Sequence, residues 1–261
     1  MTTVPVSLTS DMIAAALHQL RQNAPKVHCV TNTVAQYFTA NVVLAIGAVP
    51  SMTIAVDEVE GFATNADALL VNLGTLDDTR RVAIPKAMRA ARDAGRPVVL
   101  DPVKVHRSKV RCEFAVGLLA EKPTLLRANE DELGALFPGG ATFGDMADKD
   151  RTLAMSGRQD LIGDGQKCLR LDNGHPLLAQ VTATGCAGGA VMAAFLTVEP
   201  DPVLAAAMGL SVFNIAGEIA AERARGPGSL VPELLDALYL LDADQLDGRL
   251  KLSDLQEGTG S

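Results

Sequence analysis

Residues 68–101 read ALLVNLGTLDDTRRVAIPKAMRAARDAGRPVVLD, and this stretch decides the fold class. The run ALLVN (68–72) has the continuous apolar composition of a buried strand, and PVVL (97–100) has it again. Residues 77–94 between them have a helical pattern, and Gly95 is the kind of residue that often follows a helix. Because a helix that connects two strands in this way makes them parallel, the stretch predicts a β-α-β unit.

The same alternation continues on both sides of this unit. It predicts a mostly parallel central sheet with helices on both faces, in a single domain over residues 1–252 and a disordered tail over 253–261. Ser10 or Asp11 is expected to cap the first helix. DG and NG turns between short apolar runs predict hairpins with strands at 160–163, 167–171 and 177–179. The remaining strands or extended segments are expected at 26–30, 48–55, 124–127 and 152–155, and the helices at 11–22, 34–46, 57–64, 111–120, 130–137, 186–198, 202–224 and 230–241.

Composition narrows the class of function. Lys and Arg number 23 against 31 Asp and Glu, for a net charge of −8, which disfavours a nucleic acid or an anionic membrane as a partner. The four cysteines form no CxxC pair, so neither a disulfide framework nor a structural zinc site is expected. The N-terminus lacks the pattern of a signal peptide, and Gly, Pro or charge interrupts each apolar run. These features predict a cytoplasmic protein without a transmembrane span.

Ligands on parallel sheets bind at the carboxyl ends of the strands. The residues at those ends in this chain are Asn32, Asn72, Asp101, Arg127, Ser156 and the loop that begins at Val181.

The loop 181–189, VTATGCAGG, is the most distinctive local feature. Its small residues allow the backbone to approach a ligand closely, and it leads into an apolar helix whose first N–H groups would favour a phosphate. The alternative is a Gly- and Ala-rich helix that packs tightly on the sheet. Cys186 lies in the first turn, where the helix dipole lowers a thiol pKa and favours the thiolate; the alternative is a small buried hydrophobe.

Other strand-end residues are candidates for metal or phosphate binding. Asp101 follows a buried strand and could hold Mg²⁺, or it could cap a turn. Asn129 and Glu132 are three residues apart on one helical face and could position Mg²⁺ through water, although Glu132 could equally complement the helix dipole. Arg127 and Ser156 could contact nucleotide phosphates or remain solvated. Neither a P-loop nor a G-x-G-x-x-G motif is present, and the four histidines have no metal-binding spacing.

Taken together, a series of blocks in a fixed order resembles the hydroxyethylthiazole kinase family, a thiamine-salvage branch of the ribokinase-like superfamily. The resemblance runs from about residue 11 to residue 241 and implies a three-layer ribokinase-like fold. Three segments differ from the family pattern: 104–107 (KVHR) replaces a glycine-rich run, 183–184 (AT) replaces Gly-Ala, and the segment between residues 132 and 156 is short. The matching blocks are 27–33 (VHCVTNT), 38–41 (FTAN), 44–48 (LAIGA), 50–52 (PSM), 72–76 (NLGTL), 100–103 (LDPV), 127–132 (RANEDE), 173–175 (NGH), 181–186 (VTATGC) and 226–229 (GPGS).

The resemblance implies an activity and a set of roles. ATP would phosphorylate the hydroxyl of 4-methyl-5-(2-hydroxyethyl)thiazole with Mg²⁺, in a homotrimer with thiazole sites between subunits. Alternatives are a ribokinase-like kinase of another alcohol, such as a pyrimidine or a sugar, and a ligand-binding homologue with weakened catalysis. The implied roles are catalysis by Cys186, thiazole binding by Asn32, Met52 and Ala183, ATP binding by Arg127 and Ser156, an anion hole at Thr184 and Gly185, and support of the metal by Asp101 and Glu132.

Overall fold

A computed structural model describes residues 8–147 and 151–255 of the chain. In these residues one nine-stranded sheet has the order β2-β1-β3-β4-β5-β6-β7-β8-β9. The first six strands in this order are parallel, and β7, β8 and β9 are added antiparallel. The strands are β1 Lys26–Val30, β2 Val49–Ser51, β3 Ala68–Asn72, β4 Val98–Asp101, β5 Leu125–Asn129, β6 Thr152–Ser156, β7 Asp160–Gly163, β8 Cys168–Leu171 and β9 Leu252–Leu255.

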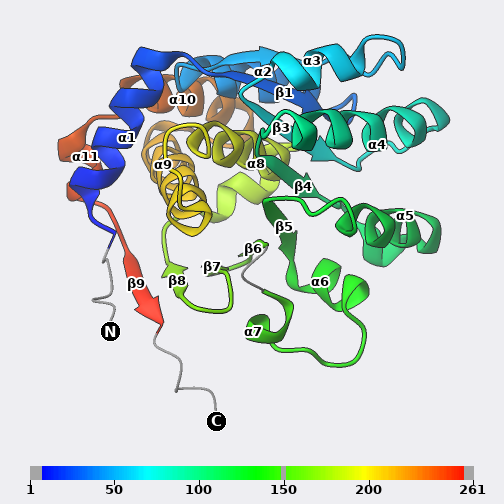
Figure 1. Cartoon of the computed structure of the whole chain (residues 1–261). Helices are drawn as coiled ribbons and strands as arrows, with labels where there is room; N and C mark the ends of the chain where they lie inside the picture. The colour runs from blue at the N-terminus through cyan, green and yellow to red at the C-terminus, as the bar shows by residue number, and fades with distance from the viewer. Residues whose placement is uncertain (1–7, 148–150, 256–261) are drawn as a thin grey trace.

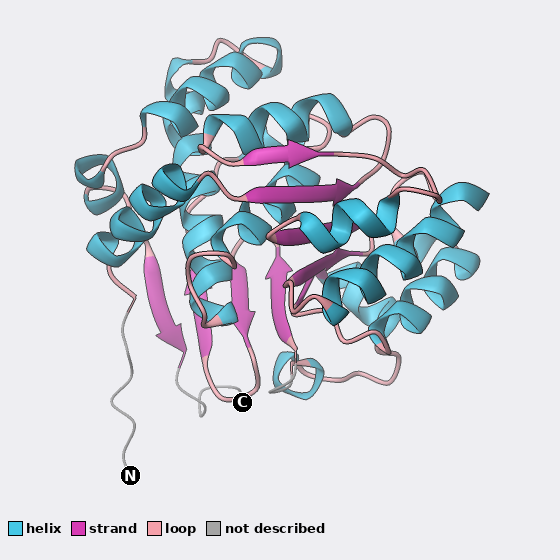
Figure 2. Cartoon of the chain, turned by 45° about the horizontal axis from the view of Figure 1, so that its top comes forward, coloured by secondary structure: helices cyan, strands magenta, loops and turns pink. Residues whose placement is uncertain are grey.

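Helices cover both faces of the sheet, so the molecule has three layers (Figures 1 and 2). Leu70 of β3 packs into the core beneath α1, α2, α8, α9 and α10, whereas its neighbours Leu69 and Val71 pack into the core beneath α3, α4, α5 and α6. The helices are α1 Ser10–Asn23, α2 Gln36–Ala45, α3 Val59–Asn65, α4 Asp78–Asp93, α5 Lys109–Leu119, α6 Glu130–Leu136, α7 Phe143–Met146, α8 Thr184–Phe195, α9 Pro202–Arg223, α10 Pro227–Leu240 and α11 Ala243–Asp247, with 3₁₀ turns η1 Val105–Arg107 and η2 Pro176–Gln180.

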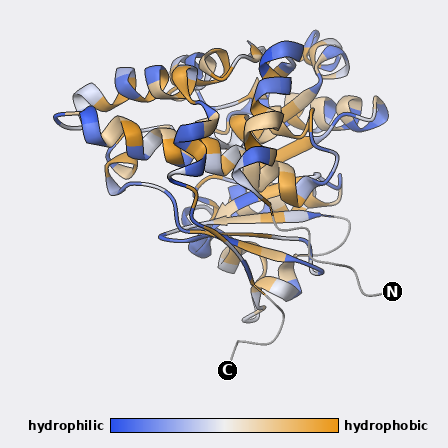
Figure 3. Cartoon of the chain, turned by 90° about the vertical axis from the view of Figure 1, so that its left-hand side faces the viewer, coloured by the Kyte–Doolittle hydropathy of each residue, from blue (hydrophilic) through white to orange (hydrophobic). Residues whose placement is uncertain are grey.

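The helix α9 is apolar around its whole circumference. By length and composition it could cross a membrane, but 94% of its most apolar window is buried inside the protein. It packs between α8 and α10, and the apolar residues concentrate in this interior (Figure 3). A helix that is hydrophobic on all sides belongs in the core of an α/β protein when its neighbours cover it, as they do here.

Several expectations are wrong in detail. Residues 177–179 are not a strand: they lie in η2, because Pro176 begins a helical turn and the His175 ring accepts a hydrogen bond from the N–H of Leu177. The tail that was expected to be disordered from residue 253 begins as β9, which pairs with β8; residues 256–261 lie outside the described part. Thr9, and neither Ser10 nor Asp11, caps α1.

The start of α8 also differs from the prediction. The helix begins at Thr184, not at Cys186, and its N-cap residue Ala183 adopts a left-handed backbone with φ of 72°. A short helix, α11, follows α10 with a capping box between Asp242 and Gln245, where no helix was predicted. The connection from β5 to β6 contains α6, close to the short helix predicted at 130–137, and the single turn α7, which was not predicted.

Candidate active site

The carboxyl ends of β1, β3 and β4 bring three polar side chains together. Asn72 and Asp101 end β3 and β4 and are direct neighbours in the register of the sheet. Asn32 follows β1 by two residues, and its Nδ2 donates to Asn72 Oδ1 over 3.0 Å. Asn72 Nδ2 in turn donates to Asp101 Oδ2 over 2.8 Å. Burial of Asn72 and Asp101 at the ends of two apolar strands therefore produces an ordered chain of amides that ends at a carboxylate.

The first turn of α8 lies over this chain. Gly189 allows the helix to approach the sheet, because a Cβ there would lie 3.2 Å from Leu70 and 4.0 Å from Asp101 Oδ2. The Thr184 hydroxyl donates to the carbonyl oxygens of Leu178 and Val181, at 3.0 Å and 3.2 Å. Ala183 provides no side-chain cap, so the amides of this turn are oriented without an internal side-chain acceptor. The turn has the features of an anion site, and Thr184 contributes through its backbone.

The thiol of Cys186 lies directly above the amide chain. Asn72 Nδ2 is 3.2 Å and Asn32 Nδ2 is 3.4 Å from Cys186 Sγ. The structure therefore brings Cys186 and Asn32 together as the sequence suggested. Asn72 is an additional member of this group, since it contacts the thiol and Asp101 at once.

Of the two alternatives for Cys186, the structure favours the buried, protonated thiol over the thiolate. Burial and, after it, the charge of Asp101 raise its pKa to about 11, although Arg127 and the amides of Asn72 and Asn32 act in the opposite direction. A buried thiol beside a carboxylate keeps its proton at neutral pH, and the position at a helix N-terminus does not overcome that desolvation.

Arg127 is the cation of this region. Its guanidinium Nη1 lies 3.6 Å from Asp101 Oδ2, and its side chain is 17% exposed. The same group lies against Gly185, where an added Cβ would come within 2.9 Å of Arg127 Nη2. Burial raises the pKa of Asp101, and the charge of Arg127 opposes that rise. Gly185 is thus required for the close approach of Arg127 to the first turn of α8.

Glu132 and Asn129 form a capping box at the start of α6. Asn129 Oδ1 accepts from the N–H of Glu132, and Glu132 Oε2 accepts from the N–H of Asn129, both at 2.9 Å. Glu132 Oε1 also accepts from the N–H of Lys104 over 2.6 Å. Val103 and Lys104 have φ of 32° and 56°, so this loop holds two non-glycine residues in a strained backbone beside Asp101.

A cavity of about 640 Å³ opens next to these groups. It is lined by four of the predicted residues, Arg127, Ser156, Thr184 and Gly185. Met52 lies apart from them: it follows the edge strand β2 and packs against the core on the α8 side. A second cavity, of about 530 Å³, lies between β2 and α3 and is lined by none of the predicted residues.

Three buried polar residues of the cavity wall were not among the predicted site residues. Asp160, Asn173 and Asn214 are almost fully buried and line the cavity. Asp160 Oδ1 accepts from the N–H of Gly157 over 3.0 Å, and burial raises the pKa of this carboxyl. The sequence feature that could have indicated this part of the cavity is Asn214, a carboxamide in the middle of an otherwise apolar helix.

The carboxylates suit a hydrated divalent cation better than a protein cage. Among the described residues no group of three His, Cys, Asp or Glu side chains could hold a metal. Asp101 and Glu132 each accept hydrogen bonds from amides. These bonds use only part of the acceptor capacity of each carboxylate. Mg²⁺ commonly binds one or two carboxylates together with water and substrate phosphates, and this donor set fits that mode.

Comparisons with known proteins agree on one family. The model of the hydroxyethylthiazole kinase family matches residues 17–144 and 141–244. A probable hydroxyethylthiazole kinase of Agrobacterium fabrum is 42% identical over 95% of this chain and 97% of that protein. A hydroxyethylthiazole kinase of Granulibacter bethesdensis is 44% identical over 86% of this chain and 88% of that protein. The structure of a hydroxyethylthiazole kinase from Pyrococcus horikoshii superposes with a TM-score of 0.89, at 34% identity, and covers 94% of this chain and all of that one.

Proposed function

The chain belongs to the hydroxyethylthiazole kinase family, and from this premise we propose that it transfers the γ-phosphoryl group of ATP to the hydroxyl of 4-methyl-5-(2-hydroxyethyl)thiazole in thiamine salvage. It is a kinase with a ribokinase-like fold, as the sequence predicted. The observation that carries the proposal is the meeting of Cys186, Asn32 and Asp101 beneath the anion-binding turn, next to a cavity of nucleotide size.

The turn at the start of α8 would bind the phosphoryl group in transfer. The backbone N–H groups of Thr184 and Gly185 form the anion hole, and the guanidinium of Arg127 beside Gly185 balances charge. Ser156 lines the same cavity and would contact ATP. The bond between the acceptor oxygen and phosphorus forms as the bond to the bridging oxygen breaks, ADP leaves, and the hydroxyl proton is released to water. Such transfers depend mainly on positioning and charge stabilisation.

Cys186 acts as a positioning group in this proposal. Its protonated thiol is a poor base at neutral pH, because burial holds its pKa near 11. The thiol would place the acceptor hydroxyl opposite the anion hole, with Asn32 and Ala183 beside the thiazole. Met52 would contact the thiazole from the edge of the sheet. Asp101 and Glu132 would hold Mg²⁺ largely through water, and the ion would neutralise the phosphates.

We infer that the working unit is a homotrimer with the thiazole site between subunits, formed by single-domain chains in the cytoplasm. The surface formed by α2 and the edge strand β2 supports this, because apolar side chains there are exposed: Tyr37 and Leu44 of α2 are 81% and 56% exposed, and Val49 of β2 is 46% exposed. An apolar surface of this kind at a sheet edge favours association. Light scattering on the purified chain should give about three times the 27.3 kDa of one chain, and a monomer at all concentrations would contradict the inference.

The activity is tested by coupled ADP release with the thiazole alcohol, ATP and Mg²⁺. Turnover with this alcohol, above that with a pyrimidine alcohol or a sugar, is the expected result. Binding of the alcohol by calorimetry with no ADP release above background would instead favour a binding protein.

Replacing Cys186 tests its role. Cys186→Ala is expected to lower kcat roughly ten- to a hundredfold, with a smaller effect on either KM, because positioning of the acceptor is lost. A change in the KM of the alcohol alone would make Cys186 a pocket residue only. Cys112→Ala is the matched control, since that thiol bonds to the carbonyl of Ala135 away from the site.

A further inference from the structure

The cavity of about 640 Å³ has one acceptor whose orientation the fold dictates, the side-chain oxygen of Asn214. Asn214 is 7% exposed and lies in the middle of α9. Its Nδ2 donates to Asp160 Oδ2 over 2.8 Å and to the carbonyl oxygen of Asn173 over 3.0 Å. Both partners are pure acceptors, so the nitrogen of the carboxamide must face them and both of its protons are used.

The oxygen of the same carboxamide therefore points away from these partners. Within residues 8–147 and 151–255, Asn214 Oδ1 accepts no hydrogen bond, and it does not belong to the polar atoms that are sealed from solvent. Because Asn214 lines the cavity, its Oδ1 is presented there as an uncommitted acceptor. An acceptor that faces the cavity and has no protein partner is available to a donor that a ligand brings.

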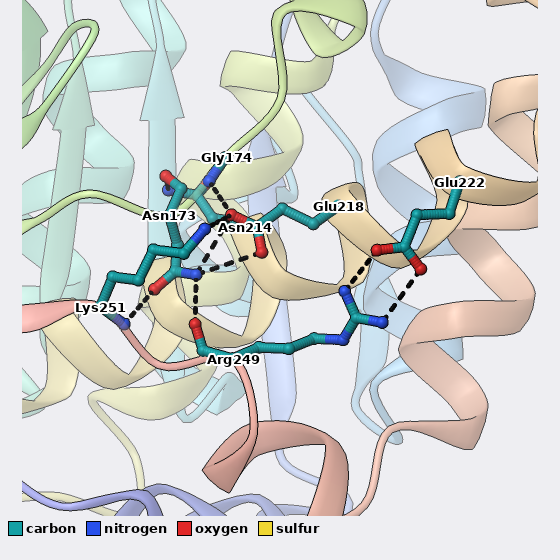
Figure 4. A network of polar contacts seen from close by, with 7 residues as sticks. All are labelled: Asn173, Gly174, Asn214, Glu218, Glu222, Arg249 and Lys251. Atoms are coloured by element: carbon teal, nitrogen blue, oxygen red, sulfur yellow. Dashed lines mark hydrogen bonds and ion pairs between the residues drawn. The ribbon is translucent and has the colours of Figure 1, made fainter.

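Hydrogen bonds from the far end of the chain fix Asn173, whose carbonyl orients Asn214. Asn173 Nδ2 donates to Glu218 and, over 2.8 Å, to the carbonyl of Arg249, while its Oδ1 accepts from the N–H of Lys251 over 2.7 Å (Figure 4). The Gly174 N–H donates to Glu218 over 3.0 Å. This network makes the floor of the cavity rigid, so the direction of Asn214 Oδ1 is preorganised.

The groups that line the cavity differ in charge and in hydrogen-bonding character. Donors and positive charge gather at Arg127, Gly185 and the first turn of α8, which suits phosphate oxygens. Asn214 presents an acceptor, which does not suit a phosphate. On a nucleoside triphosphate the groups that donate are the ribose hydroxyls and the exocyclic amino group of the base.

We propose that Asn214 Oδ1 binds a donor on the nucleoside half of the nucleotide and makes Asn214 a specificity-determining residue for the phosphoryl donor. The inference rests on the proposed function in that it takes a nucleotide as the occupant of this cavity. The shared chemistry is one N–H or O–H donor, from the adenine amino group or from a ribose hydroxyl.

Calorimetry with Mg²⁺ and no acceptor alcohol tests this on the full chain. The ligands are ATP, 2′-deoxy-ATP, 3′-deoxy-ATP and purine riboside triphosphate, which lacks the amino group. One analogue, the one without the bonded donor, is expected to bind about tenfold more weakly than ATP to the unaltered chain. A penalty for a deoxy analogue assigns the donor to the ribose, and a penalty for the purine analogue assigns it to the base.

In Asn214→Leu the same analogue should bind as ATP does, because the acceptor is gone. Asn214→Ala gives the same comparison if Asn214→Leu does not fold. Ser211→Ala is the control on the same helix: its hydroxyl is buried without a partner and does not line the cavity, so the penalty should persist there.

Equal binding of all four nucleotides to the unaltered chain would overturn the inference, and so would a penalty that persists in both Asn214 variants. If calorimetry shows the expected nucleotide selectivity but the chain releases no ADP, the proposed function is contradicted and this inference stands.

Discussion

A single buried carboxamide, that of Asn72, connects the two most reactive groups of the site. Its Nδ2 lies 3.2 Å from the thiol of Cys186 and 2.8 Å from the carboxylate of Asp101, and its Oδ1 accepts from Asn32 and from the N–H of Gly74. Asn72 thereby fixes the distance between thiol and carboxylate. Burial and, after it, the charge of this carboxylate raise the thiol pKa, so the thiol is neutral.

The protonation state of Cys186 leads to a prediction about its reactivity. The folded pKa is raised from 9.0 to about 11, so the thiolate appears only as the pH rises through that range. Alkylation of Cys186 by iodoacetamide should therefore be slow at pH 7.5 and accelerate steeply above pH ~9. Peptide mass spectrometry measures the rate, and fast labelling at neutral pH that does not change with pH would contradict it. Stability should fall over the same interval, since the unfolded chain releases this proton first.

Ala183 has a left-handed backbone conformation, which leads to a prediction about stability. Its φ of 72° is a conformation that glycine adopts freely and alanine does not. Ala183→Gly should raise the free energy of unfolding by up to about 1 kcal/mol, by relief of left-handed strain. Ala187→Gly, the same change at a helical position of α8, should lower it by about 1 kcal/mol. Urea unfolding measures both, and two changes of equal sign would show that Ala183 is unstrained.

At the scale of elements, α4 fixes the end of β1. Arg80 of α4 is 1% exposed, and its guanidinium donates to the carbonyl oxygen of Thr31, from Nη2 over 3.1 Å. Thr31 precedes Asn32, which contacts the thiol of Cys186. The helix α4, on one face of the sheet, therefore helps to place Asn32 against the helix α8 on the other face. Arg80 is thus a positioning residue, tied also to Asp77 at 2.5 Å.

Removal of this tie should affect stability and catalysis together. Arg80→Met is expected to lower the free energy of unfolding by about 2 kcal/mol, because the carbonyl of Thr31 loses a charged donor. It should also lower kcat more than it raises the KM of ATP, since Asn32 is displaced and the nucleotide cavity is not. Arg89 lies on the same helix as Arg80 and forms an exposed ion pair with Glu121. Arg89→Met breaks that pair and should change the free energy of unfolding by less than about 0.5 kcal/mol. An equal kcat in the two variants would rule out the positioning role.

Local pattern was sufficient for the parallel sheet and insufficient for the site chemistry. The strand 68–72 was predicted with both boundaries correct, because a fully apolar run between turn residues has few other solutions. The run 177–179 has the same composition, but Pro176 and the His175 cap select a 3₁₀ turn. The pKa of Cys186 depends on Asp101, which is 85 residues away in the sequence, and no local pattern reports that contact.

At the scale of the molecule, the C-terminal segment closes the sheet that begins at β2. β9 pairs with β8 over Leu252–Leu255, and the residues before it contact the floor of the cavity through Asn173. The segment from residue 253 was predicted to be a disordered tail, because the last residues of a domain are often poorly ordered. What makes it a strand is the free edge of β8, a long-range partner that the sequence does not show.

A chain that ends at Gly248 should therefore lose nucleotide affinity. Without Lys251 N–H and the Arg249 carbonyl, buried Asn173 is left partly unpaired, and the free energy of unfolding should fall by about 2 kcal/mol or more. ATP should bind more weakly, by calorimetry, while the α8 turn remains intact. A chain that ends at Leu255 is the control and should match the full chain in both measurements. Unchanged ATP binding in the shorter chain would separate the segment from the cavity.

The position of β9 also sets an order of events during synthesis. The ribosome makes Arg249 and Lys251 after every residue of α8 and α9, so a growing chain holds the thiol, the amide chain and the anion-binding turn before it has the supports of Asn173. Because a domain generally folds as a unit, the strand that completes the sheet is supplied only after the other eight strands have been made. The supports of Asn173 in the cavity floor are therefore the last part of this region to be translated.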